Sequence, residues 1–201
     1  MKKLFFVAAA FVAALMTGCS SEPAAAPAAP AQVDKAEVLM ELIQSRRSIR
    51  NYEDRAVNRD TMQQIMNAGI LAPNGMNKQS YEVKVVDNPE FINGLTELYK
   101  AENPQMAERQ GFKNMFNNAP TVAFIGVDDS YDLGRIDCGL LGENIILSAW
   151  SMGIGSCCLG SSARWIKDSP SARPYLMEMN FSEGYELLYC IALGYPDETP
   201  D

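Results

Sequence analysis

The sequence contains no histidine among its 201 residues. Histidine is the most common general base near neutral pH and the usual partner of a nucleophilic serine or cysteine. Its absence excludes those nucleophile pairs and nearly every transition-metal site that is built on imidazole ligands. Chemistry in this chain must therefore come from carboxylates, thiols, lysine or a bound cofactor, and we expect no metal site.

Positive charge is also scarce, because 17 lysines and arginines face 25 aspartates and glutamates, which gives a formal net charge of -8. An acidic protein is poorly suited to neutralising nucleic acid phosphates, so we expect no nucleic acid partner. The hydrophobic content of 47% is that of a globular protein. The chain length fits one domain of ordinary size.

The N-terminus has the pattern of a processing signal. Two lysines precede an apolar run over residues 4–16, which is too short to span a bilayer as a helix. Small residues then lead into Cys19, an order that resembles a bacterial lipobox, in which the cysteine is lipidated. We therefore predict a lipoprotein signal peptide over residues 1–18 and lipidation at Cys19. The alternative is a plain secretory signal in which this cysteine is incidental.

A tether is predicted between the lipid and the folded domain. Residues 19–33 are rich in serine, proline and alanine and show no apolar period. Ser20 stands where an aspartate would favour retention at the inner membrane, so the outer membrane of a bacterial envelope is preferred. The folded domain is expected over residues 34–197.

Helices and strands are mixed in the predicted domain without a regular alternation. Asp34 is a candidate N-cap of a helix that ends near Ser45, and a second helix begins near Arg59. Strands are predicted over residues 81–87, 121–128 and 187–195. The segment 132–152 is apolar almost all round, which predicts a helix buried on most sides. The expected fold class is α+β, with a central, largely antiparallel sheet flanked by helices.

Three separated segments carry groups suited to binding a polar cofactor. Residues 46–52 read RRSIRNY, and arginine forks with a serine hydroxyl suit a phosphate. Residues 72–80 read APNGMNKQS, whose side-chain amides can pair with a flavin or nucleobase edge. Residues 152–160 read MGIGSCCLG, where glycine lets the backbone approach a flat ligand. Taken singly, the first segment could be a solvated basic turn and the second a polar turn.

Together, and in this order, these segments resemble the nitroreductase family, and a final strand ending in ALGYP at residues 192–196 adds to the resemblance. The resemblance covers residues from about 36 to 196. It implies a nitroreductase-like fold and an FMN held at a homodimer interface. A reduced nicotinamide, NAD(P)H, or another donor would reduce the flavin, and a nitroaromatic, quinone or similar acceptor would take the electrons.

The resemblance also assigns cofactor-binding roles to eight residues: Arg46, Arg47, Ser48, Arg50, Asn77, Gln79, Leu159 and Gly160. The first three would hold the phosphate or ribityl chain, and Arg50 would lie near the pyrimidine edge. The two amides would meet polar groups of the flavin or ribityl chain. The backbone at residues 159–160 would approach the reactive flavin nitrogen. FMN would carry the chemistry, so no protein side chain is assigned as catalytic.

The C-terminus departs from the family pattern. Members often place a cation after the last strand, close to the phosphate, whereas here Asp197 and Glu198 follow and the chain ends. The phosphate would then rest on the N-terminal arginines alone, or on Arg164 or Lys167. The C-terminal arm that commonly embraces the partner subunit is missing. We expect the two acidic residues to be solvated at the strand end.

Four cysteines remain besides the lipidated one. Cys138 and Cys190 lie in apolar elements and are expected to be buried as small hydrophobic residues. We interpret Cys157 and Cys158 as packing residues near the flavin. The competing function is an envelope lipoprotein that binds flavin or another ligand without turnover, because free NAD(P)H is expected to be scarce outside the cytoplasm.

Overall fold

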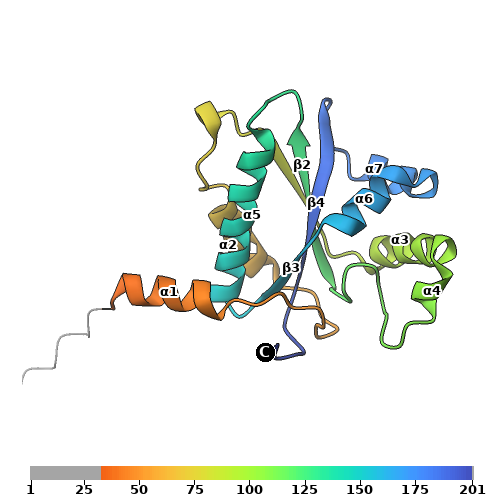
Figure 1. Cartoon of the computed structure of the whole chain (residues 1–201), viewed down its shortest axis with the longest axis horizontal. Helices are drawn as coiled ribbons and strands as arrows, with labels where there is room; N and C mark the ends of the chain where they lie inside the picture. The colour runs from red at the N-terminus through yellow and green to blue at the C-terminus, as the bar shows by residue number, and fades with distance from the viewer. Residues whose placement is uncertain (1–32, 201) are drawn as a thin grey trace, which may run out of the picture. The chain divides into compact units, whose positions relative to one another are not determined.

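A four-stranded antiparallel sheet organises residues 33–200, which are the residues that the computed structural model describes (Figure 1). The strands lie in the order β1-β2-β4-β3, with bounds β1 (Tyr81–Val86), β2 (Thr121–Asp128), β3 (Gly155–Leu159) and β4 (Tyr185–Gly194). All three pairings are antiparallel. The predicted α+β class with an antiparallel sheet is confirmed. The predicted signal peptide and Cys19 lie outside the described residues.

Helices cover both faces of this sheet (Figure 1). One face carries α2 (Arg59–Gly69) and α5 (Gly134–Ser151), and the other carries α3 (Pro89–Glu102) and α6 (Gly160–Asp168). The remaining helices are α1 (Lys35–Ser45), α4 (Pro104–Ala107) and α7 (Arg173–Glu178), with 3-10 turns η1 (Gly75–Asn77) and η2 (Pro170–Ala172). Within residues 33–200, no helix has both the length and the apolar character needed to cross a membrane. No group of three potential metal ligands is found in the same residues.

The central strand β2 explains why the fold needs two layers of helices. Val122 and Phe124 point into the core on the α3 and α6 side, while Ala123, Ile125 and Val127 point into the core on the α2 and α5 side. All five side chains are fully buried. A continuous apolar run of this kind is stable only when both faces of the sheet are covered, as the sequence predicted.

The predicted helix starts agree with the structure where local signals are strong. The Asp34 carboxylate accepts hydrogen bonds from the backbone N–H groups of Ala36 at 2.9 Å and Glu37 at 3.4 Å, and α1 ends at Ser45. Asn58 caps α2 in the same way. These side chains satisfy amide donors that the first helical turn leaves unbonded.

Two helices present an apolar surface to the outside. No residue of α1 is buried, and Leu39 and Ile43 are 51% and 47% exposed. In α5, Cys138 is buried as predicted, but Ile136 and Leu140 are 60% and 41% exposed. The expectation that α5 is buried on most sides is therefore wrong for one stripe, because no element of residues 33–200 covers it.

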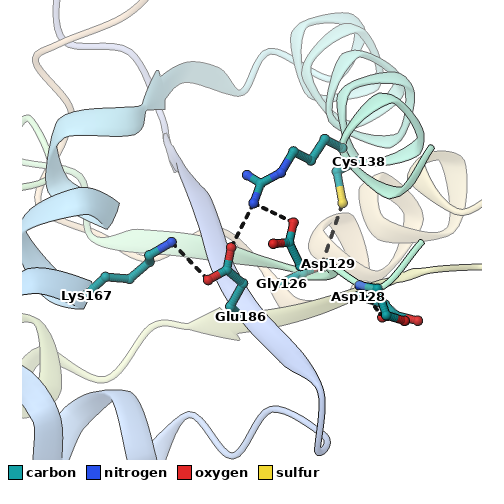
Figure 2. A network of polar contacts seen from close by, with 8 residues as sticks. Gly126, Asp128, Asp129, Cys138, Lys167 and Glu186 are labelled. Atoms are coloured by element: carbon teal, nitrogen blue, oxygen red, sulfur yellow. Dashed lines mark hydrogen bonds and ion pairs between the residues drawn. The ribbon is translucent and has the colours of Figure 1, made fainter. Parts of the chain in front are cut away.

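Ion pairs link four elements at one end of the two inner strands, β2 and β4 (Figure 2). Arg135, at the start of α5, lies 2.5 Å from Asp129 and 2.9 Å from Glu186. Lys167 of α6 lies 3.2 Å from the same Glu186 carboxylate. These groups are partly exposed, so each pair contributes little free energy. The network orients the start of α5 against β2, β4 and α6.

A second polar cluster holds the end of α3 against α6 and η2. The Glu102 carboxylate accepts hydrogen bonds from the hydroxyls of Ser171 at 2.6 Å and Ser169 at 2.7 Å, and from the indole N–H of Trp165 at 2.9 Å. The serine hydrogen bonds, with that of Trp165, lower the pKa of Glu102 below its ordinary value. Trp165 packs edge-on against Tyr99 of α3.

We expect Glu102→Gln to destabilise the protein in a pH-dependent way. Because folding lowers the pKa of Glu102, its carboxylate stabilises the fold fully above its unfolded pKa of about 4.3 and loses this effect as pH falls through the folded pKa. Urea denaturation should therefore show a lower midpoint for the variant at pH 7, and the difference should shrink at about pH 3.5. Glu97→Gln is the control, since Glu97 forms its ion pair with Lys100 on the same helix. An equal loss at both pH values would contradict the assignment.

Candidate functional site

The segment that follows α1 is fixed between two parts of the sheet. Ser48 forms a parallel bridge with Ser156 of β3, and the backbone N–H of Ile49 donates to the Ser156 carbonyl at 2.9 Å. Further along, the N–H of Glu53 donates to the carbonyl of Tyr195, just after β4, at 2.9 Å. The basic segment, residues 46–53, therefore lies beside β3 with a defined register.

Tyr52 anchors this segment in the core. Its side chain is fully buried, and its hydroxyl donates a 2.5 Å hydrogen bond to the carbonyl of Ile49. Its ring fills the space above Gly194, where an added Cβ would come within 2.8 Å of the ring. Burial raises the pKa of Tyr52 far above its ordinary value, and Cys157 and Glu198 act in the same direction. The phenol therefore stays protonated, and its O–H remains the donor of the hydrogen bond to the Ile49 carbonyl.

The arginines of the basic segment emerge next to β3. Partial desolvation and the neighbouring Cys157 raise the pKa of the Cys158 thiol, while the charge of Arg46 acts to lower it, which places Arg46 near β3. Arg50 donates from its guanidinium to the Ser48 carbonyl at 3.2 Å. Arg47 donates to the carbonyl of Gln44 at 2.7 Å, back on α1. Within residues 33–200, Arg46 and Arg50 form no ion pair.

The acidic C-terminus lies along this same segment. The backbone N–H of Arg50 donates to the Glu198 carboxylate, and the Asn51 side chain donates to the Asp197 carbonyl at 3.1 Å. The N–H of Asp197 donates back to the Asn51 carbonyl at 3.0 Å. Both acids are exposed at the strand end as expected, and in addition they extend the pairing of the chain after β4 with the basic segment.

Lys167 and Arg164 were considered above as phosphate ligands in place of a cation after the last strand. Lys167 is already paired with Glu186 in the network of Figure 2. Arg164 is exposed on α6 and forms no ion pair within the described residues 33–200. Within residues 33–200, Arg46 and Arg50 of the basic segment are therefore the cations beside β3 that form no ion pair.

The junction between β3 and α6 presents backbone to open space. Leu159 is buried, and α6 begins at Gly160 without a side-chain cap, so its first N–H groups remain available as donors. A Cβ added at Gly160 would meet nothing within 4 Å. Cys157 is buried, as expected for a packing residue. Cys158 points to the other side of the strand and is exposed, so the prediction that it packs against other residues of the same chain is wrong.

A cavity of about 300 Å³ opens between this junction and the loop that follows α4. Arg50 and Leu159 line one part of it, and the rest of the lining mixes polar residues with Tyr99, Met106, Phe112 and Met115. Sequence reasoning missed the polar residues of this lining, including two serines of α6: Arg109, Gln110, Asn114, Asn117, Asn118, Ser161 and Ser162. Asn117 and Asn118 have φ values of 55° and 66°, a left-handed conformation that asparagine tolerates well. The two consecutive asparagines could therefore have predicted a turn with left-handed backbone at this position.

The structure does not bring Asn77 and Gln79 to this site. Their loop is held at the start of α5, where the N–H of Gly75 donates to Asp137 at 3.0 Å. The basic segment meets the other end of α5, where the Trp150 indole donates to Ser45 at 2.9 Å. These two anchor points are separated by roughly 20 Å along the helix axis, at about 1.5 Å per residue. Figure 1 shows the two loops at opposite ends of α5.

Comparisons with known proteins show which family this chain resembles. The model of the nitroreductase family matches residues 43–195. An Archaeoglobus fulgidus protein, provisionally named NADH dehydrogenase/NAD(P)H nitroreductase, is 29% identical over 170 residues, covering 82% of this chain and 89% of that protein.

Solved structures match over a similar extent. A nitroreductase with bound FMN from Bacteroides fragilis is 27% identical with a TM-score of 0.71, and one from Desulfitobacterium hafniense is 28% identical with the same score. Each match covers 81% of this chain and 90% of that chain. Since the family model spans most of the chain and the antiparallel fold agrees, this chain belongs to the nitroreductase family.

Proposed function

We propose that this protein is an FMN-dependent oxidoreductase that passes electrons from NAD(P)H to a nitroaromatic, a quinone or a similar small acceptor. The observation that carries the proposal is the fixed basic segment beside an open, uncapped helix start at Gly160. This arrangement gathers cationic side chains and backbone N–H donors around the same opening at the β3–α6 junction. Relatives with bound FMN support the same cofactor here.

The residues present fit FMN. A flat ring needs backbone without an obstructing side chain, which Gly160 provides, and a phosphate needs forked cationic donors and hydroxyls, which Arg46 and Ser48 provide. When bound, FMN supplies the chemistry of hydride and electron transfer. This assignment agrees with a chain that has no histidine, since no protein general base is required.

Each part of the site has a separate task. Arg46 and Ser48, assisted by Arg47, hold the phosphate and ribityl end. Arg50 would place positive charge near the pyrimidine edge of a bound FMN, where positive charge favours reduction of the ring. The first amides of α6, beginning at Gly160, would donate toward the ring, and the helix dipole would add to their effect.

A homodimer completes the site. The outer faces of α1 and α5 expose large apolar side chains, and a soluble protein rarely leaves such a surface open. A two-fold related copy would cover it. Within one chain, the loop with Asn77 and Gln79 lies about one helix length from the basic segment. The two-fold related copy would bring the partner's loop to the basic segment of the first chain.

The protein is proposed to be lipid-anchored through Cys19 in a bacterial envelope, preferably at the outer membrane. The support is the order of the N-terminal sequence, with two lysines, an apolar run and small residues before the cysteine. The tether would let the domain face its substrates without entering the bilayer.

A flavin spectrum tests the function. The purified protein should show bound oxidised FMN, and anaerobic NADH or NADPH should bleach it. An acceptor such as a quinone should restore the oxidised spectrum. Bound flavin that stays oxidised with both nicotinamides and with a redox protein as donor would favour the alternative, a binding module without turnover.

Arg46→Ala should lose most of its FMN. A charge-assisted hydrogen bond contributes about 1.5–3 kcal/mol, so the loss of one phosphate contact should weaken binding roughly 10- to 150-fold. Quenching of flavin fluorescence on titration measures the affinity. Arg173→Ala, on α7 and outside the cavity, is the control. Unchanged affinity in a folded Arg46 variant would remove this residue from the site.

The shared site predicts complementation between two defective chains. Arg46→Ala and Gln79→Ala should each impair both sites of a homodimer. After co-expression, half of the dimers are mixed, and each has one intact site, so about a quarter of the normal flavin occupancy should return. Arg46→Ala with Ser48→Ala is the matched control, because both residues belong to the same half-site and no intact site forms. Equal recovery in the two mixtures would refute sharing.

Cys19→Ala should release the protein from the membrane fraction. The variant loses the only thiol that the lipobox-like order would present for lipid attachment, so labelled palmitate should no longer be incorporated. Cell fractionation with detergent extraction measures the distribution. A variant that still carries the label would show that the anchor is elsewhere.

A further inference from the structure

The cavity beside the proposed flavin site has a charge pattern opposite to that of the whole protein. The chain has 25 acidic and 17 basic residues, yet the cavity is lined by two arginines and by no aspartate or glutamate. Its other polar lining consists mainly of side-chain amides and serines. A cavity that is lined by two arginines and by no carboxylate suits an anionic ligand.

Of the two arginines, Arg109 is the one that the proposed flavin site does not use. Within residues 33–200 it forms no ion pair, and its side chain makes no hydrogen bond. Two parts of the cavity lining are nevertheless held together, since Ser162 of α6 donates to the Met115 carbonyl at 2.9 Å. Arg109 and Leu159 line the same cavity.

The backbone around Arg109 is ordered by its own hydrogen bonds. Its N–H donates to the Met106 carbonyl at 3.2 Å, and its carbonyl accepts from Phe112 at 3.1 Å. Asn118 closes the next turn, accepting from the N–H of Lys113 at 2.8 Å and donating to the Gly111 carbonyl at 2.9 Å. The loop backbone is therefore held in place, and the Arg109 guanidinium on it is available to an anion.

We propose that Arg109, with the neighbouring amide of Gln110, binds an anionic group of the substrate in this cavity. The group is a carboxylate or a phosphate. It belongs either to the electron acceptor or to the nicotinamide donor, both of which must reach the same flavin face in turn. This inference rests on the proposed oxidoreductase function and adds a substrate class to it.

Two pairs of probes separate these sources. 4-Nitrobenzoate and 4-nitrobenzamide are acceptors that differ in charge, and reduced nicotinamide mononucleotide and the reduced riboside are donors that differ by one phosphate. For Arg109→Gln, the KM of the anionic member of one pair should rise about 10-fold, while its neutral counterpart and the FMN affinity should not change. The pair that responds identifies the source. Arg109→Lys should recover part of the loss, and Arg173→Gln is the control.

Calorimetric titration of the anionic probes without turnover separates this inference from the proposed function. Binding of 4-nitrobenzoate or nicotinamide mononucleotide that weakens in Arg109→Gln would support the anion site even if no nicotinamide reduced the flavin. Equal KM changes for charged and neutral probes, a fall in FMN affinity instead, or no change with either pair would each overturn the assignment of Arg109.

Discussion

The backbone pairing of the basic segment with β3 and with the chain after β4 is the interaction on which the site depends. Because β3 is an edge strand, the hydrogen bond from Ile49 to Ser156 also covers part of an edge that would otherwise be open. Tyr52 locks the segment by filling the space that Gly194 leaves. The segment is therefore placed mainly by backbone hydrogen bonds and by the buried Tyr52, and within residues 33–200 the guanidinium groups of Arg46 and Arg50 form no ion pair.

Sequence reasoning succeeded where local signals decide the structure. The cap at Asp34 and the apolar run of β2 act within a few residues, and both elements were predicted closely. It missed α3 although Asn88 and a following proline give a usual helix start. It missed α6 for a different reason, since that helix starts at a glycine with serines after it and forms because Ala163 and Ile166 pack into the core.

Part of the site was also predictable from the sequence. The resemblance grouped the arginines with residues 159–160, and the bridge between Ser48 and Ser156 brings those segments to the same strand. The contact of Glu198 with Arg50 joins residues far apart in the chain, and no local pattern announces it. Arg109 likewise comes to line one cavity with Leu159 only through tertiary packing, so its charge became informative only once the cavity was known.

The geometry of α5 connects the exposed apolar surface with the divided site. This helix carries the loop of Asn77 at its start and meets the basic segment at its end, and its exposed stripe, with Ile136 and Leu140, lies toward the start. If two copies of α5 packed antiparallel about a two-fold axis, the start of one helix would lie beside the end of the other. The contact that removes apolar surface from water would then also assemble each cofactor site, so that cofactor binding and association would stabilise each other.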